Sequence, residues 1–454
     1  MPQDQAITYQ VASAANQADR VAHGDLVYRH QTIPRFVASR GCELVDDAGY
    51  RYLDAEASSG TAGLGFDSLI VARAAERVAE MPVLPSFCES RLREEVAARL
   101  AARLAEATGR TGRIAFELGG AQGIELALKV VRRNSAGSQI AVFEGGYHGR
   151  SGLAAQLSAS HRLRRLDGGW RIPVVRLPYP DPERGPLGEV PGGFTVGALA
   201  RVDQLTTADY CGVVAPGGDA DVAALIIEPA LNAGGIVLPD PDYLLGVVEK
   251  FRSLGALIVV DEIFCGFHRL GPAWGFARYP GLDPDIVVLG KALTNGIMPM
   301  TCVWARDPLM DPGHFPPGTH ASTFQATPLA LAVASEVLDR YDAWADLPDQ
   351  IGAVERGLRA VVDDVLDRSA AATSGWACGC LARIRLDSAR APWLAERALV
   401  IGRDEPVGGV HGILLSAPGM APDVIGFAPP LVISQAELKI LHELTLRLFA
   451  QLPG

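Results

Sequence analysis

The strongest constraint on the fold is an alternation, between residues 113 and 325, of short apolar runs with helix-length segments. The runs include "RIAFELGG", "QIAVFEGG", "AALIIEP", "ALIVVDEIF" and "DIVVLGKAL", and the first precedes the helical pattern "IELALKVVRR". Strand-like runs separated by helix-length segments predict parallel crossover units. We therefore predict an α/β fold in which helices cover both faces of a mostly parallel sheet.

Patterns on either side of this region predict a smaller second domain. The stretch "GCELVDDAGYRYLDAEAS" places a D-A-G-Y turn between two alternating runs, which indicates an antiparallel hairpin. "LALAVASEVLDRYDAW" and "SQAELKILHELTLRLFAQL" have helical spacing, the second with Ser434 as N-cap. We expect residues 66–330 to form the large domain, and residues 1–65 and 331–454 to combine in a smaller α+β domain.

The composition argues against several classes of protein. A chain of 454 residues is long enough for two or three lobes, and a net charge of −11 argues against nucleic acid as a partner. Because there is no run of about 18 apolar residues, we expect no membrane partner. The start "MPQDQAITYQ" lacks the basic and apolar regions of a signal peptide, so we expect a cytoplasmic protein.

The cysteines and histidines do not predict a metal site. The seven cysteines are scattered, and in a cytoplasmic protein we expect free thiols. Cys378 and Cys380 form a C-x-C pair with no second pair at zinc spacing, and we interpret them as small residues beside a strand. His314 and His320 flank a Pro/Gly loop that has no carboxylate at helical spacing.

The run "DIVVLGKALTNG" ends a strand-like segment with a lysine, Lys291. A strand this apolar is normally buried on both faces of a parallel sheet, and lysine is rarely buried without a partner. Lys291 therefore either reaches solvent at the strand end or has a partner inside. A buried lysine beside an aldehyde cofactor forms a Schiff base, since burial lowers its pKa and makes it nucleophilic.

Two glycine-containing turns also follow strand-like runs. In "FELGGAQGIELALK" a Gly pair precedes a helix, so Gly119, Gly120 and Ala121 offer backbone N–H groups to an anion. The alternative is an ordinary tight turn. In "VFEGGYHGRS" Tyr147 and His148 either stack on a flat ring or pack in the core.

Asp261 and Glu262 end the run "ALIVVDEIF". Ligands of open α/β sheets bind beyond the carboxyl ends of the strands, where Asp261 would be poorly solvated. A metal ion, a protonated ring nitrogen or a salt bridge with Arg269 would satisfy it. Anion cradle, aromatic, carboxylate and lysine together fit the phosphate, ring, pyridine nitrogen and aldehyde of pyridoxal 5'-phosphate (PLP).

The chain resembles the class III (ω-) aminotransferases, enzymes of PLP fold type I, over nearly its whole length. The segment "IVVDEIFCGFHRLGPAWGFARYPGLDPDIVVLGKAL" is similar to the family's D-E-[VI] strand, G-F-x-R-x-G turn, P-D-I-V strand and cofactor lysine. "GGAQGIELALKVVRR" is similar to its phosphate helix, and "YHGRS", "IIEPALNAGG" and "STFQATPLA" follow in the family's order. The resemblance implies a seven-stranded type of sheet in the large domain.

The resemblance also implies roles for single residues. Lys291 would bind the cofactor as a Schiff base and move the proton between substrate and cofactor. Asp261 would keep the pyridine nitrogen protonated, and Glu228 would lie at the cofactor edge. Ile263 and Tyr147 would cover the two faces of the ring.

The other implied contacts concern the phosphate and the partner subunit. Gly120 and Ala121 would donate backbone N–H groups to the phosphate, and His148 belongs to the same cofactor site. Thr323 would donate to the phosphate of the neighbouring subunit, so the active unit would be a homodimer with shared sites.

Three residues are substrate-binding candidates by family position. Ser59 and Phe87 would line the substrate pocket, where ordinary packing is the alternative. Arg150 would bind a distal carboxylate, such as that of glutamate or 2-oxoglutarate, or else face solvent.

The departures from the family pattern concern both cofactor and substrate. Gly119 and Ala121 replace hydroxyl residues, so more of the phosphate binding would fall on the backbone and on Thr323. Phe264 stands where some relatives carry a glutamine that contacts the phenolic oxygen of the cofactor.

Relatives specific for amino acids pair an arginine before "F-x-P-P-L" with a glutamate in "E-P-x-x-x-E" to bind an α-carboxylate. Here Gly426 and Ala233 occupy those positions. Loss of both partners avoids a buried unpaired charge. It implies a substrate without an α-carboxylate.

The resulting prediction is a PLP-dependent transaminase that moves an amino group from an amine donor to an aldehyde or ketone acceptor by a ping-pong mechanism. An aminomutase or a decarboxylase on the same fold is the alternative, because fold alone does not settle function. A non-catalytic PLP-fold binding protein is a further alternative. A Rossmann dehydrogenase would need G-x-G-x-x-G, which is absent.

Overall fold

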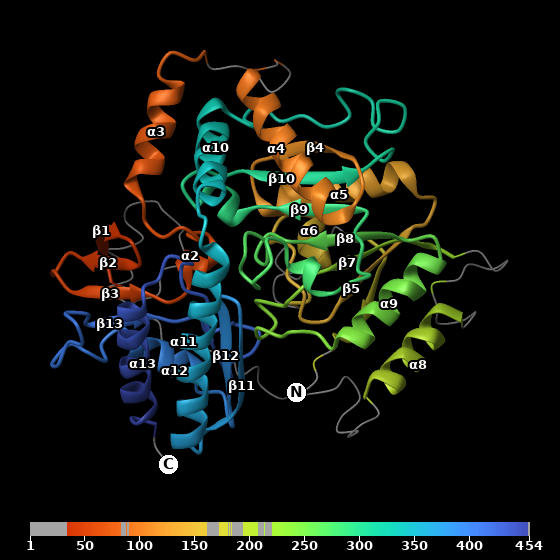
Figure 1. The fold of residues 1–454 in the computed structure, drawn as a ribbon. Helices are drawn as coiled ribbons and strands as arrows, with labels where there is room; N and C mark the ends of the chain where they lie inside the picture. Colours follow the sequence, from red (N-terminus) through yellow and green to blue (C-terminus); the bar gives the residue numbers. More distant parts are fainter. Residues whose placement is uncertain are drawn as a thin grey trace, which may run out of the picture.

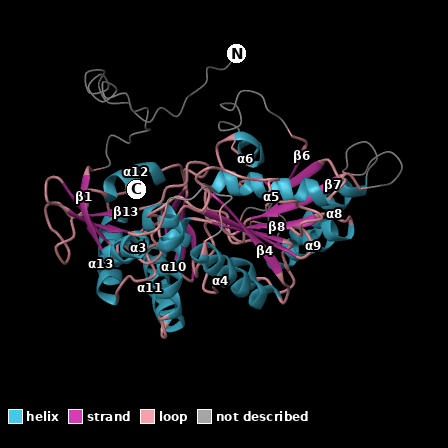
Figure 2. Cartoon of the chain, turned by 90° about the horizontal axis from the view of Figure 1, so that it is seen from above, coloured by secondary structure: helices cyan, strands magenta, loops and turns pink. Residues whose placement is uncertain are grey.

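The computed structural model describes residues 34–82, 88, 90–160, 172–179, 181, 183, 194–207, 213 and 220–452. A seven-stranded sheet lies at the centre of the larger part (Figures 1 and 2). Its strands are, in spatial order, β4 (Gly112–Glu117), β10 (Thr301–Arg306), β9 (Ile286–Leu289), β8 (Leu257–Asp261), β7 (Val222–Ile227), β5 (Gln139–Phe143) and β6 (Val174–Leu177). Only β10 runs antiparallel to its neighbours, which confirms the predicted mostly parallel sheet.

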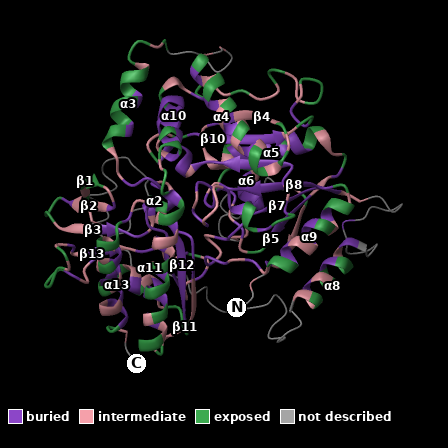
Figure 3. Cartoon of the chain, in the orientation of Figure 1, coloured by how far each residue is buried: buried purple, intermediate pink, exposed green. Residues whose placement is uncertain are grey.

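Helices cover both faces of this sheet because its strands are apolar on both sides. Ile140 and Val142 of β5 share a hydrophobic core with α5 and α6, whereas Ala141 and Phe143 point into the core on the other face, with α4 and α9. In Figure 3 the sheet is buried and the exposed residues lie on the outer helices. The helices of this part are α4 (Arg91–Thr108), α5 (Gly120–Asn134), α6 (Gly152–Leu157), α8 (Phe194–Thr207), α9 (Pro241–Ser253), α10 (Pro328–Asp342) and the 3-10 helices η1 (Gly275–Arg278) and η2 (Lys291–Thr294).

The two ends of the described chain meet in a second, four-stranded sheet. Its strands are β1 (Phe36–Arg40), β2 (Glu43–Asp46), β3 (Arg51–Asp54) and β13 (Gly412–Leu414). Strand β13 pairs with β3 in parallel, so a C-terminal strand completes an N-terminal sheet. The limits of the domains at residues 65 and 330 stay a prediction.

A third sheet and the remaining helices complete the fold. The sheet consists of β11 (Ala372–Cys378), β12 (Leu381–Leu386) and β14 (Val424–Phe427), which pair antiparallel. The helices are α2 (Ala57–Gly60), α3 (Ser68–Val78), α11 (Leu347–Arg368), α12 (Ala391–Ala398) and α13 (Gln435–Phe449). No helix within the described ranges is long and apolar enough to cross a membrane.

Several local predictions are confirmed. Strands β2 and β3 form the predicted hairpin, whose turn is closed by backbone N–H groups that donate to the Asp46 carboxylate. Ser434 caps α13 in a reciprocal capping box with Glu437. Cys378 and Cys380 are buried free thiols at the β11–β12 turn.

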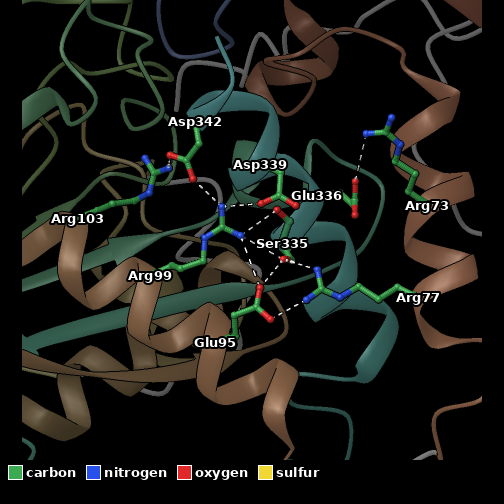
Figure 4. A network of polar contacts seen from close by, with 9 residues as sticks. All are labelled: Arg73, Arg77, Glu95, Arg99, Arg103, Ser335, Glu336, Asp339 and Asp342. Atoms are coloured by element: carbon green, nitrogen blue, oxygen red, sulfur yellow. Dashed lines mark hydrogen bonds and ion pairs between the residues drawn. The ribbon is translucent and has the colours of Figure 1, made fainter. Parts of the chain in front are cut away.

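A polar network joins α4 to α10 (Figure 4). The Arg99 guanidinium on α4 lies 2.8 Å from the Asp339 carboxylate and 2.7 Å from that of Asp342, both on α10. It also donates to the hydroxyl of the fully buried Ser335 at 3.2 Å. Glu95 accepts from the same hydroxyl. One guanidinium therefore connects two helices at several points.

Helix α3 is fastened to the same two helices. Arg77 donates to the Ser335 hydroxyl at 2.7 Å and to the Glu95 carboxylate at 2.7 Å. Arg340 of α10 donates to Asp67, which caps α3. These contacts fix α3 although it buries only two of its residues, Ile70 and Ala74.

We expect Arg99→Met to lower the free energy of unfolding by about 1–2 kcal/mol, because it removes a charged donor shared by three partners. Thermal unfolding followed by circular dichroism measures the change. Arg73→Met is the matched control: the Arg73 guanidinium is half-exposed and lies 4.0 Å from Glu336, so its loss should cost less than about 0.5 kcal/mol. Equal effects of the two variants would contradict a structural role for the Arg99 network.

Candidate active site

A cavity of about 970 Å³ opens at the edge of the large sheet where the parallel strands end. The carboxyl ends of parallel strands are where open α/β sheets bind ligands. Ten of the residues singled out from the sequence line this cavity: Ser59, Gly120, Ala121, Tyr147, His148, Arg150, Glu228, Asp261, Ile263 and Lys291. The structure therefore brings together residues that are up to 232 positions apart, since Ser59 and Lys291 share one wall.

Lys291 follows β9 after Gly290 and begins η2 with φ +45°. This left-handed conformation is uncommon for a non-glycine residue. The ammonium lies 4.7 Å from the centroid of the Phe264 ring. Burial lowers the pKa of Lys291, and the negative charges of Asp261 and Glu228 oppose that effect. Of the two alternatives for Lys291, solvent at the strand end or a partner inside, the structure therefore supports the second.

Asp261 is the last residue of β8 and is buried. One carboxylate oxygen accepts from the Ile263 N–H at 3.1 Å, and the other lies 2.9 Å from Nδ1 of the buried His148. Burial opposes a charge on His148, but the hydrogen bond and the charge of Asp261 outweigh it and raise the pKa of the imidazole. Asp261 is thus held by a donor on its inner side and lines the cavity.

The alternative salt bridge between Asp261 and Arg269 is wrong. The Arg269 guanidinium is fully buried and donates to the backbone carbonyls of Cys380 at 2.9 Å and Pro429 at 2.6 Å. Arg269 therefore joins the β8 segment to the C-terminal part of the chain and leaves the Asp261 carboxylate to the cavity.

Glu228 follows β7 and is also buried. Its carboxylate accepts from the Tyr147 backbone N–H at 2.7 Å, which fixes the turn that carries this aromatic residue. Burial raises the pKa of Glu228 to about 7; the nearby His148 lowers it and Asp261 raises it. A carboxyl group that titrates near neutrality can hold or release a proton at the pH of the cell.

Backbone N–H groups face the cavity at the start of α5. The helix begins at Gly120, and its N-cap Gly119 has no side chain to accept from the first turn. The first N–H groups of a helix have no partner within the helix and carry the positive end of its dipole. Gly119, Gly120, Ala121 and Gln122 all line the cavity, so this helix start can hold an anion such as a phosphate.

Tyr147 and Ile263 come from the turns after β5 and β8 and both line the cavity. The Ile263 side chain lies against Gly120, where an added Cβ would approach it to 3.3 Å. The Arg150 guanidinium lies 5.7 Å from the centroid of the Tyr147 ring.

Two predicted residues are not among those described as lining the cavity. Thr323 is exposed and does not line the cavity of its own chain. Phe87 lies outside the described residues.

The structure adds residues that the sequence did not single out. Residues 296–301, directly after η2, line the cavity together with Thr61, Gln122 and Thr294. In the sequence, only their position shortly after Lys291 could have indicated them. Their residue types form no recognisable chemical pattern. Glu56 was missed for another reason. Its pKa depends on its burial and on Lys291, which only the fold brings close.

Glu56 precedes the kinked helix α2, in which Ser58 and Ser59 have positive φ. Its backbone N–H donates to the buried Asp54 carboxylate at 3.0 Å. Burial and the charge of Asp54 raise the pKa of Glu56 to about 7, while hydrogen bonds from Ser59 and the charge of Lys291 lower it. Glu56 is therefore a third acidic group near the lysine, after Asp261 and Glu228.

Because the folded chain holds the pKa of Glu56 at about 7, above its usual 4.5, the folded state binds this proton more tightly than the unfolded state. This contribution to stability is complete below about pH 4.5 and is lost as the pH rises through 7. We expect Glu56→Gln to flatten the dependence of the thermal unfolding midpoint on pH between 5 and 8 in cofactor-free protein. If the unfolding midpoint of Glu56→Gln changed with pH as in the unmodified chain, the raised pKa of Glu56 would be refuted.

Sequence comparisons agree with this geometry. The family model described as "Aminotransferase class-III" matches residues 28–447. Ornithine aminotransferase from Saccharomyces cerevisiae is 29% identical over 335 residues, which cover 70% of this chain and 71% of that protein. Acetylornithine aminotransferase from Streptomyces clavuligerus is 29% identical over 416 residues, covering 89% and 88%.

Solved structures share the fold. An amine transaminase from an uncultivated Pseudomonas species, in its PLP-bound internal aldimine form, has a TM-score of 0.82 at 23% identity and covers 99% of both chains. The omega transaminase from Pseudomonas jessenii in complex with PMP also has a TM-score of 0.82, at 22% identity, and covers 95% of this chain and 97% of that one. The fold is PLP fold type I. With a family model that spans nearly the whole chain, the protein belongs to the class III aminotransferases and is a PLP-dependent enzyme.

Proposed function

We propose that this enzyme is a transaminase that moves an amino group between an amine donor and an aldehyde or ketone acceptor, and that at least one substrate lacks an α-carboxylate. The observation that carries the proposal is the cavity wall at Ala233, which offers no charged group to a carboxylate. Among the described residues that line the cavity, Arg150 is the only arginine.

The side chain of Ile236 occupies the space where a side chain at position 426 would begin. A Cβ added to Gly426 would lie 1.9 Å from Cδ1 of Ile236, which is fully buried. Ile236 itself has φ +52°, and its carbonyl accepts from the buried Arg383 at 3.2 Å. A guanidinium clamp on a carboxylate is strong and specific, so its absence favours substrates whose amine carbon carries other groups.

The walls at the substrate end are small or apolar. Ser59 and Thr61 have short side chains, and Ile297, Met298 and Met300 contribute apolar surface. Such a lining suits a side group of some size, because apolar area removed from water contributes about 25 cal/mol per Å².

Arg150 supports a second substrate of a different kind. It is exposed at the cavity rim beside the Tyr147 ring. From there it can pair with the distal carboxylate of a donor such as glutamate, without any contact to an α-carboxylate.

When bound, PLP supplies the aldehyde that takes up the amino group and the ring that withdraws electrons from the bond that breaks. Lys291 would hold the cofactor and then, with its lowered pKa, would take the proton from the substrate carbon and deliver it to the cofactor. Asp261, oriented by His148, would pair with the pyridine nitrogen, and the start of α5 would hold the phosphate. Two such half-reactions in turn make a ping-pong exchange.

A homodimer completes the proposal. Apolar side chains are exposed on α3 and before α10, among them Leu69 (52%), Val71 (47%) and Phe324 (65%). A second copy of the chain would cover them. It would also bring its exposed Thr323 to a phosphate cradle that has no hydroxyl side chain of its own at Gly119 and Ala121.

The proposal is tested by an absorbance titration of the purified holoenzyme with single amines and amino acids. We expect amines without an α-carboxylate to remove the visible band of the lysine-bound cofactor, and a carbonyl acceptor to restore it. Lys291→Ala should abolish both the band and the cofactor–protein bond that borohydride reduction makes detectable by mass spectrometry. Reaction with α-amino acids alone, unchanged by Arg150→Met, would refute the substrate assignment; carbon dioxide release without amino transfer would indicate a decarboxylase.

We expect His148→Phe to weaken PLP binding about tenfold or more. The variant keeps a ring but leaves the buried Asp261 carboxylate without its side-chain donor. A titration of cofactor-free protein with PLP measures the affinity. His148→Gln can still donate a hydrogen bond, so its PLP affinity should lie between those of the unmodified protein and His148→Phe. An unchanged affinity in His148→Phe would show that the imidazole does not support Asp261.

A further inference from the structure

The turn that carries Thr323 is bound to the two elements that flank the phosphate cradle of its own chain, β4 and α5. Nε2 of His320 lies 2.8 Å from a carboxylate oxygen of Glu117, the last residue of β4. Nδ1 of His320 lies 3.2 Å from the Lys129 ammonium on α5, which also donates to the Thr319 carbonyl at 3.2 Å. The imidazole is therefore held from both sides.

The hydrogen-bond chemistry fixes the direction of each contact. A lysine ammonium can only donate, so Nδ1 of His320 accepts from Lys129. Nε2 then carries the proton and donates to Glu117. Glu117 is buried, so loss of this donor would leave a carboxylate oxygen without its partner in the interior.

Glu117 connects this contact to the cavity. Its second oxygen accepts from the Leu118 N–H at 2.7 Å. Leu118 and Gly119 line the cavity directly before α5 begins. One carboxylate thus holds both the start of the cradle and the histidine of the Thr323 turn.

A second side chain fixes the far end of the turn. Nε2 of Gln325 donates to the carbonyl of Phe116 in β4, and its Oε1 accepts from the Ser322 N–H at 3.3 Å. Thr323 lies between His320 and Gln325, both anchored to β4, and is itself exposed. The turn is therefore a fixed support that presents an exposed residue.

We propose that His320 is a positioning residue, held by Glu117 and Lys129, which places Thr323 for the cofactor site of a second copy of this chain. The inference rests on the proposed homodimer and deepens it. His320 acts in trans: its loss weakens the PLP site of the other subunit and not the site of its own. No chemical step depends on it, because it lies behind the turn and does not line the cavity.

The first test is the affinity of cofactor-free protein for PLP, followed by absorbance. His320→Leu should weaken binding about tenfold, and His320→Gln, whose amide can still donate to Glu117, should recover most of it. Lys129→Met removes the exposed partner of His320 and should weaken PLP binding less than His320→Leu does. His314→Gln is the matched control, because His314 lies on the same loop with an exposed side chain and should bind PLP normally. Normal affinity in His320→Leu would overturn the proposal.

Hybrid dimers then separate action in trans from action in cis. In one hybrid, a Lys291→Ala subunit pairs with a His320→Leu subunit, so the only lysine-bearing site receives Thr323 from a turn with an intact His320. In the other, an unmodified subunit pairs with a subunit that carries both substitutions. We expect PLP affinity equal to an unmodified/Lys291→Ala hybrid in the first case and about tenfold weaker in the second.

The reverse order of affinities would overturn the trans assignment. Sedimentation of the unmodified holoenzyme keeps the two proposals apart. A monomer that transaminates would refute the shared site, and His320 with it, but leave the proposed reaction standing. A dimer with the expected hybrids and no amino transfer would refute the reaction and leave the role of His320 standing.

Discussion

The site depends on the burial of one lysine amine beside two buried carboxylates, Asp261 and Glu228. A buried ammonium is costly unless it is paired, and here Asp261 and Glu228 supply the opposing charge. Neither carboxylate is free to collapse onto the lysine, because Asp261 is held by His148 and Glu228 by the Tyr147 backbone. The contact between Glu228 and the Tyr147 backbone also fixes the turn that brings Tyr147 to the cavity wall.

The large sheet and most of the cavity could be predicted because they follow from local patterns. Each apolar run ends at a definite residue, and parallel strands bring those ends to one edge. Lys291 and Asp261 therefore line one cavity although the 3-10 helix η1 stands between their strands. The order of the runs along the chain was enough to place them, whatever the details of packing.

What could not be predicted depends on partners far apart in the sequence. The partners of Arg269 are backbone carbonyls of Cys380 and Pro429, and a backbone carbonyl has no signature in the sequence. The pKa of Glu56 depends on how deeply α2 is buried beside Asp54 and Lys291. Residues 296–301 line the cavity only because the chain turns back after η2.

The conformation of Ile236 has an evolutionary consequence. A β-branched residue in the left-handed region is strained, and it persists here because Arg383 holds its carbonyl and its side chain fills the space beside Gly426. Substitutions that share one space are not additive. An arginine introduced at position 426 would meet the isoleucine before it met any substrate. The residue at position 236 therefore constrains position 426, and a change at one requires an adjustment at the other.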